Sequence, residues 1–409
     1  MSMNKTWSML WLITAIVTVI VSCSRQDPDD KLVPCKDIIL TRSEMEYVEE
    51  GNQLAFKFFN EVYSHRDFII SPFSLQRCLG MVQNGAQGKT REEIAAVIGY
   101  GEADNAAINS FLQSYTSQLQ VVDPSTSFEL ADALLVGSWF PVKGDFRDRV
   151  SSCYDAEVIN LDFWNSEQSK VFINDWVKTA TNGMISSLID EVDPLTVSMV
   201  LNAFAFKGKW TSVFDPDYTA KDYSFQRFDG GTSRVDMMYQ KGSFEYASDD
   251  EYQLLCLPYG NGAFQMVILL PRSVDGDFSS VRMEQWEGLL MKAEKEEIPV
   301  MIPRFSIATS LDLDDPLSEM GMPVAFTSEA DFSLIAGVPG DILLKKTRQA
   351  CFIEVDESGT KAAAATVIPA AFDGSPLPSL QFLADHPFLF AIIEKSTQGI
   401  LLIGQFCGE

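Results

Sequence analysis

The segment "FIEVDESGTKAAAAT", residues 352–366, decides how the rest of this 409-residue chain is interpreted. It begins with alternating apolar and acidic residues, as a half-buried strand does, and ends in four alanines and a threonine. A Pro/Gly/Ser-rich run follows, so that residues 358–385 form one connection between two apolar segments. Connections longer than about 15 residues are usually functional or disordered. This loop is therefore the first candidate for the functional element.

The first half of the loop is compatible with more than one conformation. Every second residue from Thr360 to Ala370 is small and mostly apolar, which would suit a strand buried on one face. The alanine run also favours a helix, and it would be tolerated in an exposed loop. A switch between two states and a flexible low-complexity linker both remain open from these residues alone.

Composition and charge restrict the function. Apolar residues make up 46% of the chain and include 28 Phe, which is enough for one large core. The formal net charge of −26 would repel phosphate backbones, so nucleic acid is not an expected partner. Apolar strand patterns become denser towards the C-terminus, helical patterns lie between them, and neither a repeat nor an internal linker is visible. We expect a single α+β domain over residues 41–409.

The N-terminus has the form of a bacterial export signal. Lys5 precedes an apolar run from Trp7 to Val21, which is shorter than a membrane-spanning helix requires. Residues 20–23, Ile-Val-Ser-Cys, resemble the lipobox of bacterial lipoproteins, although an ordinary secretory signal is the alternative. We expect a signal peptide over residues 1–22, lipidation of Cys23 and an acidic tether over residues 23–40. The protein would then be a bacterial outer membrane lipoprotein facing the cell surface or the periplasm, held to the membrane by its lipid alone.

The helix after the tether is expected to open with a capping box at Ser43-Glu44-Met45-Glu46, where a serine is followed three residues later by a glutamate. Common catalytic and metal-binding signatures are missing from the sequence. The chain has two histidines, His65 in a charged turn and His386 before a buried strand, and no Cys-x-x-Cys pair. We assign no catalytic residue, metal or cofactor, and a lipoprotein hydrolase is disfavoured.

Residues 41–408 resemble the serpin family. The matching segments occur in the family's order and at its usual separations, so the resemblance is highly specific. They include Ser71-Pro72-Phe73-Ser74, "NGAQGKTREEI", "ADALLV", "INDWVKTATNGMI", "LNAFAFKGKW", "ILLPR", "IPRF", "FIEVDESGTKAAAAT", Asp385-His386-Pro387-Phe388 and "ILLIGQF".

The resemblance implies a serpin fold with three β-sheets, about nine helices and an exposed reactive-centre loop. It also implies a suicide-substrate inhibitor: a serine or cysteine protease cleaves the loop, the cleaved part inserts into the central sheet, and the acyl-linked enzyme is trapped. We expect a monomer. The implied hinge comprises Glu357, Gly359, Thr360, Lys361, Ala362, Ala363, Ala364, Ala365 and Thr366.

Three residues match the polar cluster at which the family's central sheet opens, Ser71, Ser74 and Asn202, and Gln349 occupies the fourth position of this cluster. Gln349 stands where the family has histidine, and Asp67 stands where it has asparagine. Lys361 replaces an acidic residue, and Pro369 would remove one hydrogen-bond donor from the inserted strand. No Lys or Arg occurs between Gly101 and Val142, so a glycosaminoglycan activator is not expected.

Counting the family's spacing from Glu357 places the reactive bond at Asp373-Gly374, which suits Asp- or Glu-selective proteases. Phe372 offers two alternatives: it could fill the apolar pocket of a papain-like enzyme, or a chymotrypsin-like enzyme could cut at Phe372-Asp373. The run "FDGSPLPS" also has plain turn composition. The alternative function is a non-inhibitory binding or carrier protein of the same fold, in which Pro369 and the altered cluster block insertion.

Overall fold

The structure is a computed structural model that describes residues 33–101, 103–274, 276, 278–279, 281–360 and 380–409. Residues 33–409 form one compact unit. The helices run in this order: α1 (Arg42–Glu61), α2 (Pro72–Gln83), α3 (Gly88–Val97), α4 (Asn105–Val121), α5 (Gly144–Tyr154), α6 (Ser166–Ala180), η1 (Pro216–Tyr218), α7 (Met283–Leu290), α8 (Asp314–Met320) and η2 (Pro323–Phe326), where η marks a 3-10 helix.

Fifteen strands accompany them in the described part of the chain. They are β1 (Phe68–Ile70), β2 (Thr126–Gly137), β3 (Glu157–Leu161), β4 (Ser198–Gly208), β5 (Ala220–Gln226), β6 (Thr232–Ser248), β7 (Tyr252–Tyr259), β8 (Phe264–Pro271), β9 (Glu294–Pro303), β10 (Phe305–Asp312), β11 (Arg348–Asp356), β12 (Gly359–Thr360), β13 (Phe382–Leu383), β14 (Phe388–Glu394) and β15 (Ile400–Phe406).

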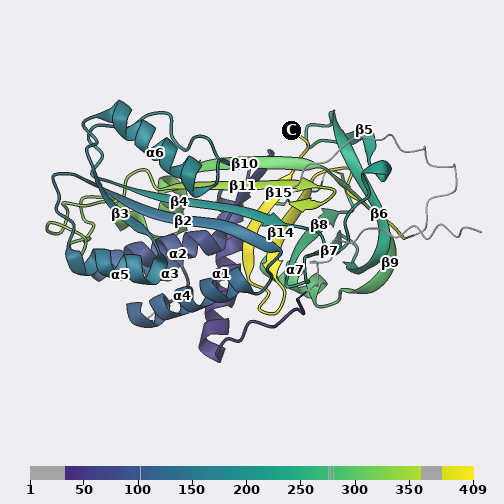
Figure 1. The fold of residues 1–409 in the computed structure, drawn as a ribbon, viewed down its shortest axis with the longest axis horizontal. Helices are drawn as coiled ribbons and strands as arrows, with labels where there is room; N and C mark the ends of the chain where they lie inside the picture. The colour runs from purple at the N-terminus through teal and green to yellow at the C-terminus, as the bar shows by residue number, and fades with distance from the viewer. Residues whose placement is uncertain (1–32, 102, 275, 277, 280, 361–379) are drawn as a thin grey trace, which may run out of the picture. The chain divides into compact units, whose positions relative to one another are not determined.

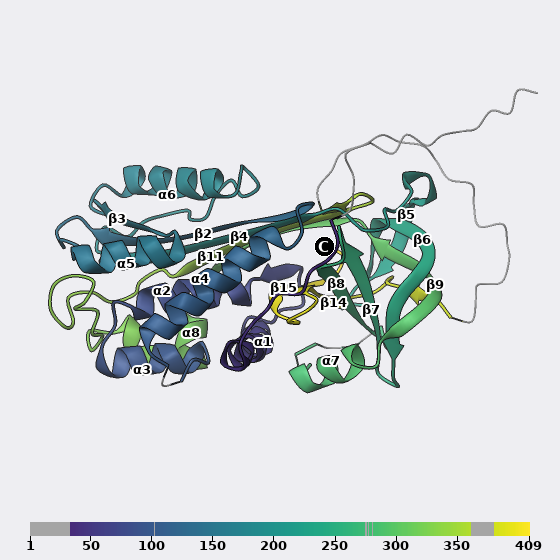
Figure 2. The ribbon, with the colours of Figure 1, turned by 60° about the horizontal axis from the view of Figure 1, so that its bottom comes forward.

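A six-stranded sheet runs in the order β10-β11-β4-β2-β3, with β12 added to the end of β11 (Figure 1). Figure 2 shows α6 on one face of this sheet and α2, α3 and α4 on the other. Ile173 and Val177 of α6 are fully buried with apolar residues of β2 and β4, including Leu135 and Leu201. Both faces of the sheet are therefore covered over much of its length, which explains the nearly continuous burial along β4.

A nine-stranded sheet takes the order β1-β15-β14-β8-β7-β6-β9-β13, with β5 paired to the start of β6. Strands β8, β14 and β15 are buried at every residue, as their largely apolar sequences predicted. The 17 residues of β6 pair with β5 at one end and with β7 at the other. This single long strand joins segments that would otherwise belong to two sheets, so the described residues contain two hydrogen-bonded sheets rather than the three expected.

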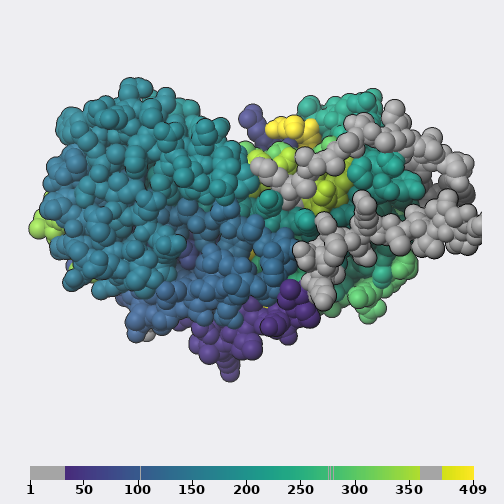
Figure 3. Space-filling view, in the orientation of Figure 1, coloured from purple at the N-terminus to yellow at the C-terminus, as the bar shows by residue number. Residues whose placement is uncertain are grey.

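The mixed α+β architecture that the sequence predicted is confirmed. Eight α-helices and two short 3-10 helices lie in the described residues, close to the expected nine. The capping box prediction was wrong by two residues, because Thr41 caps α1 with Glu44 as its partner. No helix within the described ranges is long and apolar enough to cross a membrane. Figure 3 shows blue to teal atoms, the colours of α4, α5 and α6, over the left part of the face in view.

Candidate functional site

The structure brings the four residues of the expected polar cluster into direct contact. Ser71 caps α2, and its hydroxyl donates to the Leu401 carbonyl at 2.7 Å while it accepts from the Ser74 N–H at 3.1 Å. Gln349 of β11 accepts from the Ser71 N–H at 3.0 Å and donates back to the Ser71 carbonyl at the same distance. It also donates to Asn202 Oδ1 at 2.8 Å. Glutamine therefore bridges α2, β11 and β4 at the position where the family has histidine.

Two charged residues extend this cluster, and the sequence analysis missed both. Asp132 of β2 accepts from Asn202 Nδ2 at 2.7 Å and lies 3.5 Å from the Arg77 guanidinium of α2. Burial raises the pKa of Asp132, although Arg77 and Asn202 act to lower it. Arg77 is itself buried and donates to Thr116 Oγ1 at 2.8 Å. A lone aspartate in the apolar strand "ADALLV" was the signal that could have found this pair.

Asp67, another departure from the family pattern, holds the C-terminus rather than the cluster. Its carboxylate accepts from the Cys407 N–H at 2.5 Å and is also hydrogen-bonded by the N–H groups of Gly408 and Glu409. Burial raises the pKa of Asp67 to about 6 despite these donors, and the nearby Glu409 adds to the shift. At neutral pH the Asp67 carboxyl is therefore mostly ionised, and this ionisation destabilises the fold relative to the unfolded chain.

Glu357, the first residue of the expected hinge, is only 4% exposed. Its carboxylate is bound by the Arg304 guanidinium and accepts from Thr219 Oγ1 at 2.6 Å. Burial acts to raise the pKa of Glu357, but the bonds from Thr219 and Arg304 outweigh it and hold the pKa below its usual range. The start of the hinge is thus fixed by an ion pair and a hydroxyl from two other strand connections.

Gly359 lies where the hinge enters the six-stranded sheet. Strand β12 pairs antiparallel with the end of β11, with Gly359 opposite Asp356, and Gly359 also forms a bridge with Lys209 just after β4. Its φ angle is +141°, and a Cβ atom there would approach the Gly208 carbonyl oxygen to 2.2 Å. Only glycine fits this position without strain, because neither the backbone angle nor the space suits a side chain.

The six-stranded sheet is open at the end that receives the hinge. The parallel pairing of β11 with β4 runs from Arg348–Leu201 to Phe352–Ala205 and stops there. Beyond that point, β11 pairs with β12 instead. The hinge therefore already occupies the place between β11 and β4 at this end of the sheet.

Several expected site residues lie outside the described residues. They are Cys23, the rest of the hinge (Lys361, Ala362, Ala363, Ala364, Ala365 and Thr366), Pro369, and the two candidate reactive bonds at Phe372, Asp373 and Gly374.

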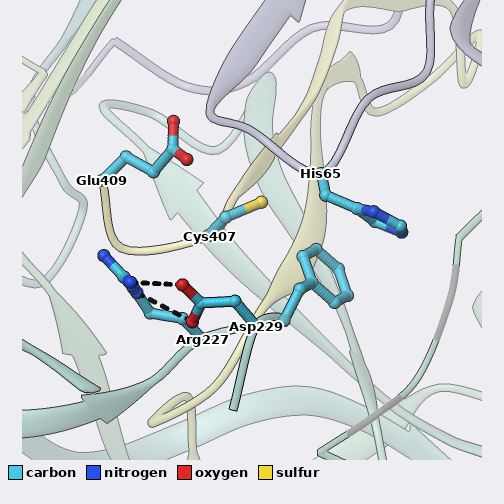
Figure 4. A pocket seen from close by; sticks show the side chains of 6 residues that line it. His65, Arg227, Asp229, Cys407 and Glu409 are labelled. Atoms are coloured by element: carbon cyan, nitrogen blue, oxygen red, sulfur yellow. Dashed lines mark hydrogen bonds and ion pairs between the residues drawn. The ribbon is translucent and has the colours of Figure 1, made fainter. Parts of the chain in front are cut away.

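The two histidines occupy different environments. His386 is 7% exposed, with one ring nitrogen 2.8 Å from Asp385 Oδ1 and the other 2.7 Å from the Pro271 carbonyl, as a structural histidine would be. His65 lies on a pocket of about 180 Å³ with Phe228, Arg227 and Cys407 among its lining residues (Figure 4). In that pocket Arg227 is paired with Asp229. Burial raises the pKa of the Cys407 thiol, so this cysteine is not poised for nucleophilic chemistry.

Comparisons with known proteins find the family that the sequence resembles. The family model described as "Serpin (serine protease inhibitor)" matches residues 49–408. The leukocyte elastase inhibitor of Bos taurus is 32% identical over 379 residues, covering 88% of this chain and 99% of that protein. Serpin48 of the insect Tenebrio molitor, described as highly specific, superposes with a TM-score of 0.78 at 29% identity, covering 90% and 99% of the two chains. A thyroxine-binding globulin in complex with thyroxine gives a TM-score of 0.79 at 25% identity, covering 89% and 98%.

Proposed function

Because the chain belongs to the serpin family, we propose that it inhibits a serine or cysteine protease as a suicide substrate. Cleavage of the loop, at Asp373-Gly374 or alternatively at Phe372-Asp373, would let the hinge continue into the six-stranded sheet and trap the acyl-enzyme. The observation that carries this proposal is β12, because the first hinge residues are already paired with β11 and bridged to the residue that follows β4.

The register of β12 supports this proposal. If the pairing of Val355 with Thr360 continued residue by residue along β11, Thr366 would come opposite Gln349. If the Lys209–Gly359 bridge continued along β4, the same threonine would come opposite Asn202. Insertion would therefore break the bond between Gln349 and Asn202 and place Thr366 between them. Its small side chain carries a hydroxyl that can bond to both amides.

The free energy available from insertion is large. Roughly ten new ladder hydrogen bonds at about 1 kcal/mol each would contribute on the order of 10 kcal/mol, comparable to the stability of a whole domain. The uncleaved form would then be kinetically trapped, and cleavage would release the strain. The alanine run from Ala362 to Ala365 is small enough to enter a packed sheet.

The test incubates the purified protein with Asp-selective, papain-like and chymotrypsin-like proteases and resolves the products on denaturing gels. We expect an adduct that survives denaturation and a released C-terminal peptide beginning at Gly374, identified by mass spectrometry. A peptide beginning at Asp373 would move the bond to the alternative. If every protease cleaves the loop and turns over without an adduct, the inhibitor proposal is wrong.

A non-inhibitory binding or carrier protein of the same fold is the second candidate. Pro369 favours it, because proline cannot donate to a sheet ladder and would weaken late insertion. Loop cleavage separates the two functions. An inhibitor should gain thermal stability after cleavage, whereas a protein that cannot insert its loop should show the same melting temperature before and after.

We also propose that the protein is a monomer and is anchored in a bacterial outer membrane through lipid on Cys23. The exported chain would have the acidic tether between this lipid and the folded unit. More than one acyl chain is needed for stable anchoring, since each buried methylene contributes about 0.8 kcal/mol. Incorporation of labelled palmitate that is lost in Cys23→Ala would support the anchor, and equal labelling of both proteins would reject it. Light scattering of the folded unit in the absence of detergent tests whether the protein is a monomer.

A further inference from the structure

Two large apolar side chains are exposed in the connection between β4 and β5. Val213 is 62% exposed and Tyr218 is 59% exposed. Both belong to residues 211–218, in which Phe214 is the one buried side chain. The two exposed residues are five positions apart in the chain, and tyrosine is among the residues that contribute most to binding between proteins.

This connection is held rigidly against the hinge. The Phe214 N–H donates to the Glu357 carbonyl at 2.8 Å, and the Phe214 ring packs on Trp210. The Thr211 N–H donates to the Pro258 carbonyl at 2.9 Å, and Asp215 caps the 3-10 turn that carries Tyr218. A surface that is already ordered loses little conformational entropy when a partner binds.

Residues 211–218 of the connection are also acidic, and its one cation, the exposed Lys209, precedes them. Asp215 and Asp217 are exposed, and residues 211–218 contain no lysine or arginine. The next cation along the chain, Lys221, binds Asp236 at 2.6 Å. Complementary charge would therefore come from a partner with basic side chains, which would also associate faster at low salt.

A protease attacking the loop would reach this surface. The Tyr218 ring contacts the Tyr239 ring of β6, with centroids 6.3 Å apart. Tyr239 pairs with Met301 of β9, which pairs with Leu383 of β13, so two strand spacings of about 5 Å separate Tyr239 from the strand that follows the loop.

The length of chain after the reactive bond limits how far a bound enzyme lies from the strand that follows the loop. Five residues lie between Gly374 and Leu380, and the six steps from one to the other span at most about 20 Å when extended. A globular enzyme of about 200 residues is about 40 Å across. An enzyme bound at the reactive bond would therefore be large enough and near enough to contact Tyr218.

We propose that Val213, Asp215, Asp217 and Tyr218, the 213–218 patch, form a second contact surface for the target protease and select an enzyme whose rim carries basic side chains beside an apolar group. The inference rests on the proposed function, because it takes a protease as the partner of the loop. The patch would set the rate of association, while the residues around the reactive bond would set which bond is cut.

The test uses chymotrypsin, which is cationic, and succinylated chymotrypsin, in which the lysine amines have become carboxylates. Rates of adduct formation and of loop cleavage are measured with the unmodified protein, Tyr218→Ser and Asp217→Lys, at low and high salt, and normalised to each enzyme's activity on a small peptide. The control is Asp148→Lys, a charge reversal at an exposed position of α5, at the opposite end of the unit (Figure 1). Papain is used in the same way.

We expect Tyr218→Ser to slow association with chymotrypsin at least about fivefold, and Asp217→Lys to slow it about five- to tenfold at low salt but less than twofold at 0.5 M salt. Succinylation should reverse the effect of Asp217→Lys, and Asp148→Lys should change each rate less than about twofold.

The possible outcomes separate the hypothesis that the 213–218 patch binds the protease from the hypothesis that the protein is an inhibitor. If adducts form at rates that the patch variants do not change, the patch is rejected and the inhibitor stands. If the loop is cleaved without an adduct, the inhibitor is rejected, and the cleavage rates still test the patch. If neither cationic enzyme attacks the loop, the patch is rejected as a surface that selects basic proteases.

Discussion

Gln349 Nε2 donates to Asn202 Oδ1 at 2.8 Å, and the two residues are direct partners in the pairing of β11 with β4. These are the strands that must separate if the loop inserts. The bond lies three residues below the point where their ladder stops, between Phe352 and Ala205. It is therefore among the first side-chain contacts that insertion would break.

Replacing Gln349 by leucine should weaken the contact between β11 and β4. Leucine has a similar volume, but it leaves the Ser71 N–H and the Asn202 carbonyl oxygen without their partner. Buried unpaired polar groups cost about 1–3 kcal/mol each, so Gln349→Leu should lower the free energy of unfolding by about 2–6 kcal/mol in urea titrations. Gln349→His, the family's residue, should lose much less. Equal losses in the two variants would show that volume, not hydrogen bonding, matters here.

Gly359 gives a prediction about the hinge itself. Gly359→Ala should displace β12, because the new Cβ would meet the Gly208 carbonyl oxygen. Backbone strain of about 1–2 kcal/mol adds to that clash. Gly262→Ala is the matched control, since Gly262 has a φ of +90° but open space around it. We expect a larger loss of thermal stability in Gly359→Ala and a larger fraction of protein that is cleaved without forming an adduct. Identical behaviour of the two variants would mean that β12 has no special role.

Asp67 should make the protein less stable above pH 6. Its pKa of about 6 in the fold lies above the ordinary value of 3.8, so its protonated form is favoured. The contribution of Asp67 to stability is therefore fully present below about pH 4 and is lost as the pH rises through 6. Asp67→Asn should raise the free energy of unfolding at pH 7.5 by on the order of 2 kcal/mol and leave it unchanged at pH 4. Asp148→Asn on α5 is the control, and a gain at pH 7.5 no larger than that of this control would contradict the prediction.

Glu357 should show the opposite dependence. Its pKa is held below 4.5, so the stability it contributes is present above that pH and is lost as the pH falls through its pKa in the fold. Glu357→Gln should cost about 1.5–3 kcal/mol at pH 7, because the charge-assisted bonds to Arg304 and Thr219 weaken, and much less near pH 3. Glu354→Gln, three residues earlier on β11, is the comparison for general charge effects. A cost that does not change with pH would argue against the ion pair.

Much of the fold could be predicted because long apolar patterns and ordered family motifs determine it together. The capping box shows the limit of local patterns. Both Thr41-x-x-Glu44 and Ser43-x-x-Glu46 fit the rule, and the helix begins at the first of them. A pattern of four residues therefore does not predict which of the two capping boxes forms.

The candidate site was predicted in part. The family motifs located Ser71, Ser74, Asn202 and Gln349, but Arg304 and Thr219, the partners of Glu357, come from elements 53 and 138 residues away. Pairings at such distances depend on sheet topology, which one sequence does not reveal. Arg77 and Asp132 were missed for the same reason, although a lone charge in an apolar strand should prompt a search for its partner.

Pro369 allows the strongest test of whether the loop can insert fully. Continuing the register of the Lys209–Gly359 bridge brings Pro369 opposite Met199 near the start of β4, whereas on the other side it would lie beyond Arg348, the first residue of β11. Only one neighbouring strand would accompany the proline, so at most one ladder bond is lost, about 1 kcal/mol. Pro369→Ala should therefore raise the melting temperature of the cleaved protein by only a few degrees and leave the yield of adduct within about twofold. The opposite result would be a natural protein that forms no adduct and a Pro369→Ala variant that does. This one residue would then block insertion, and the carrier function would describe the natural chain.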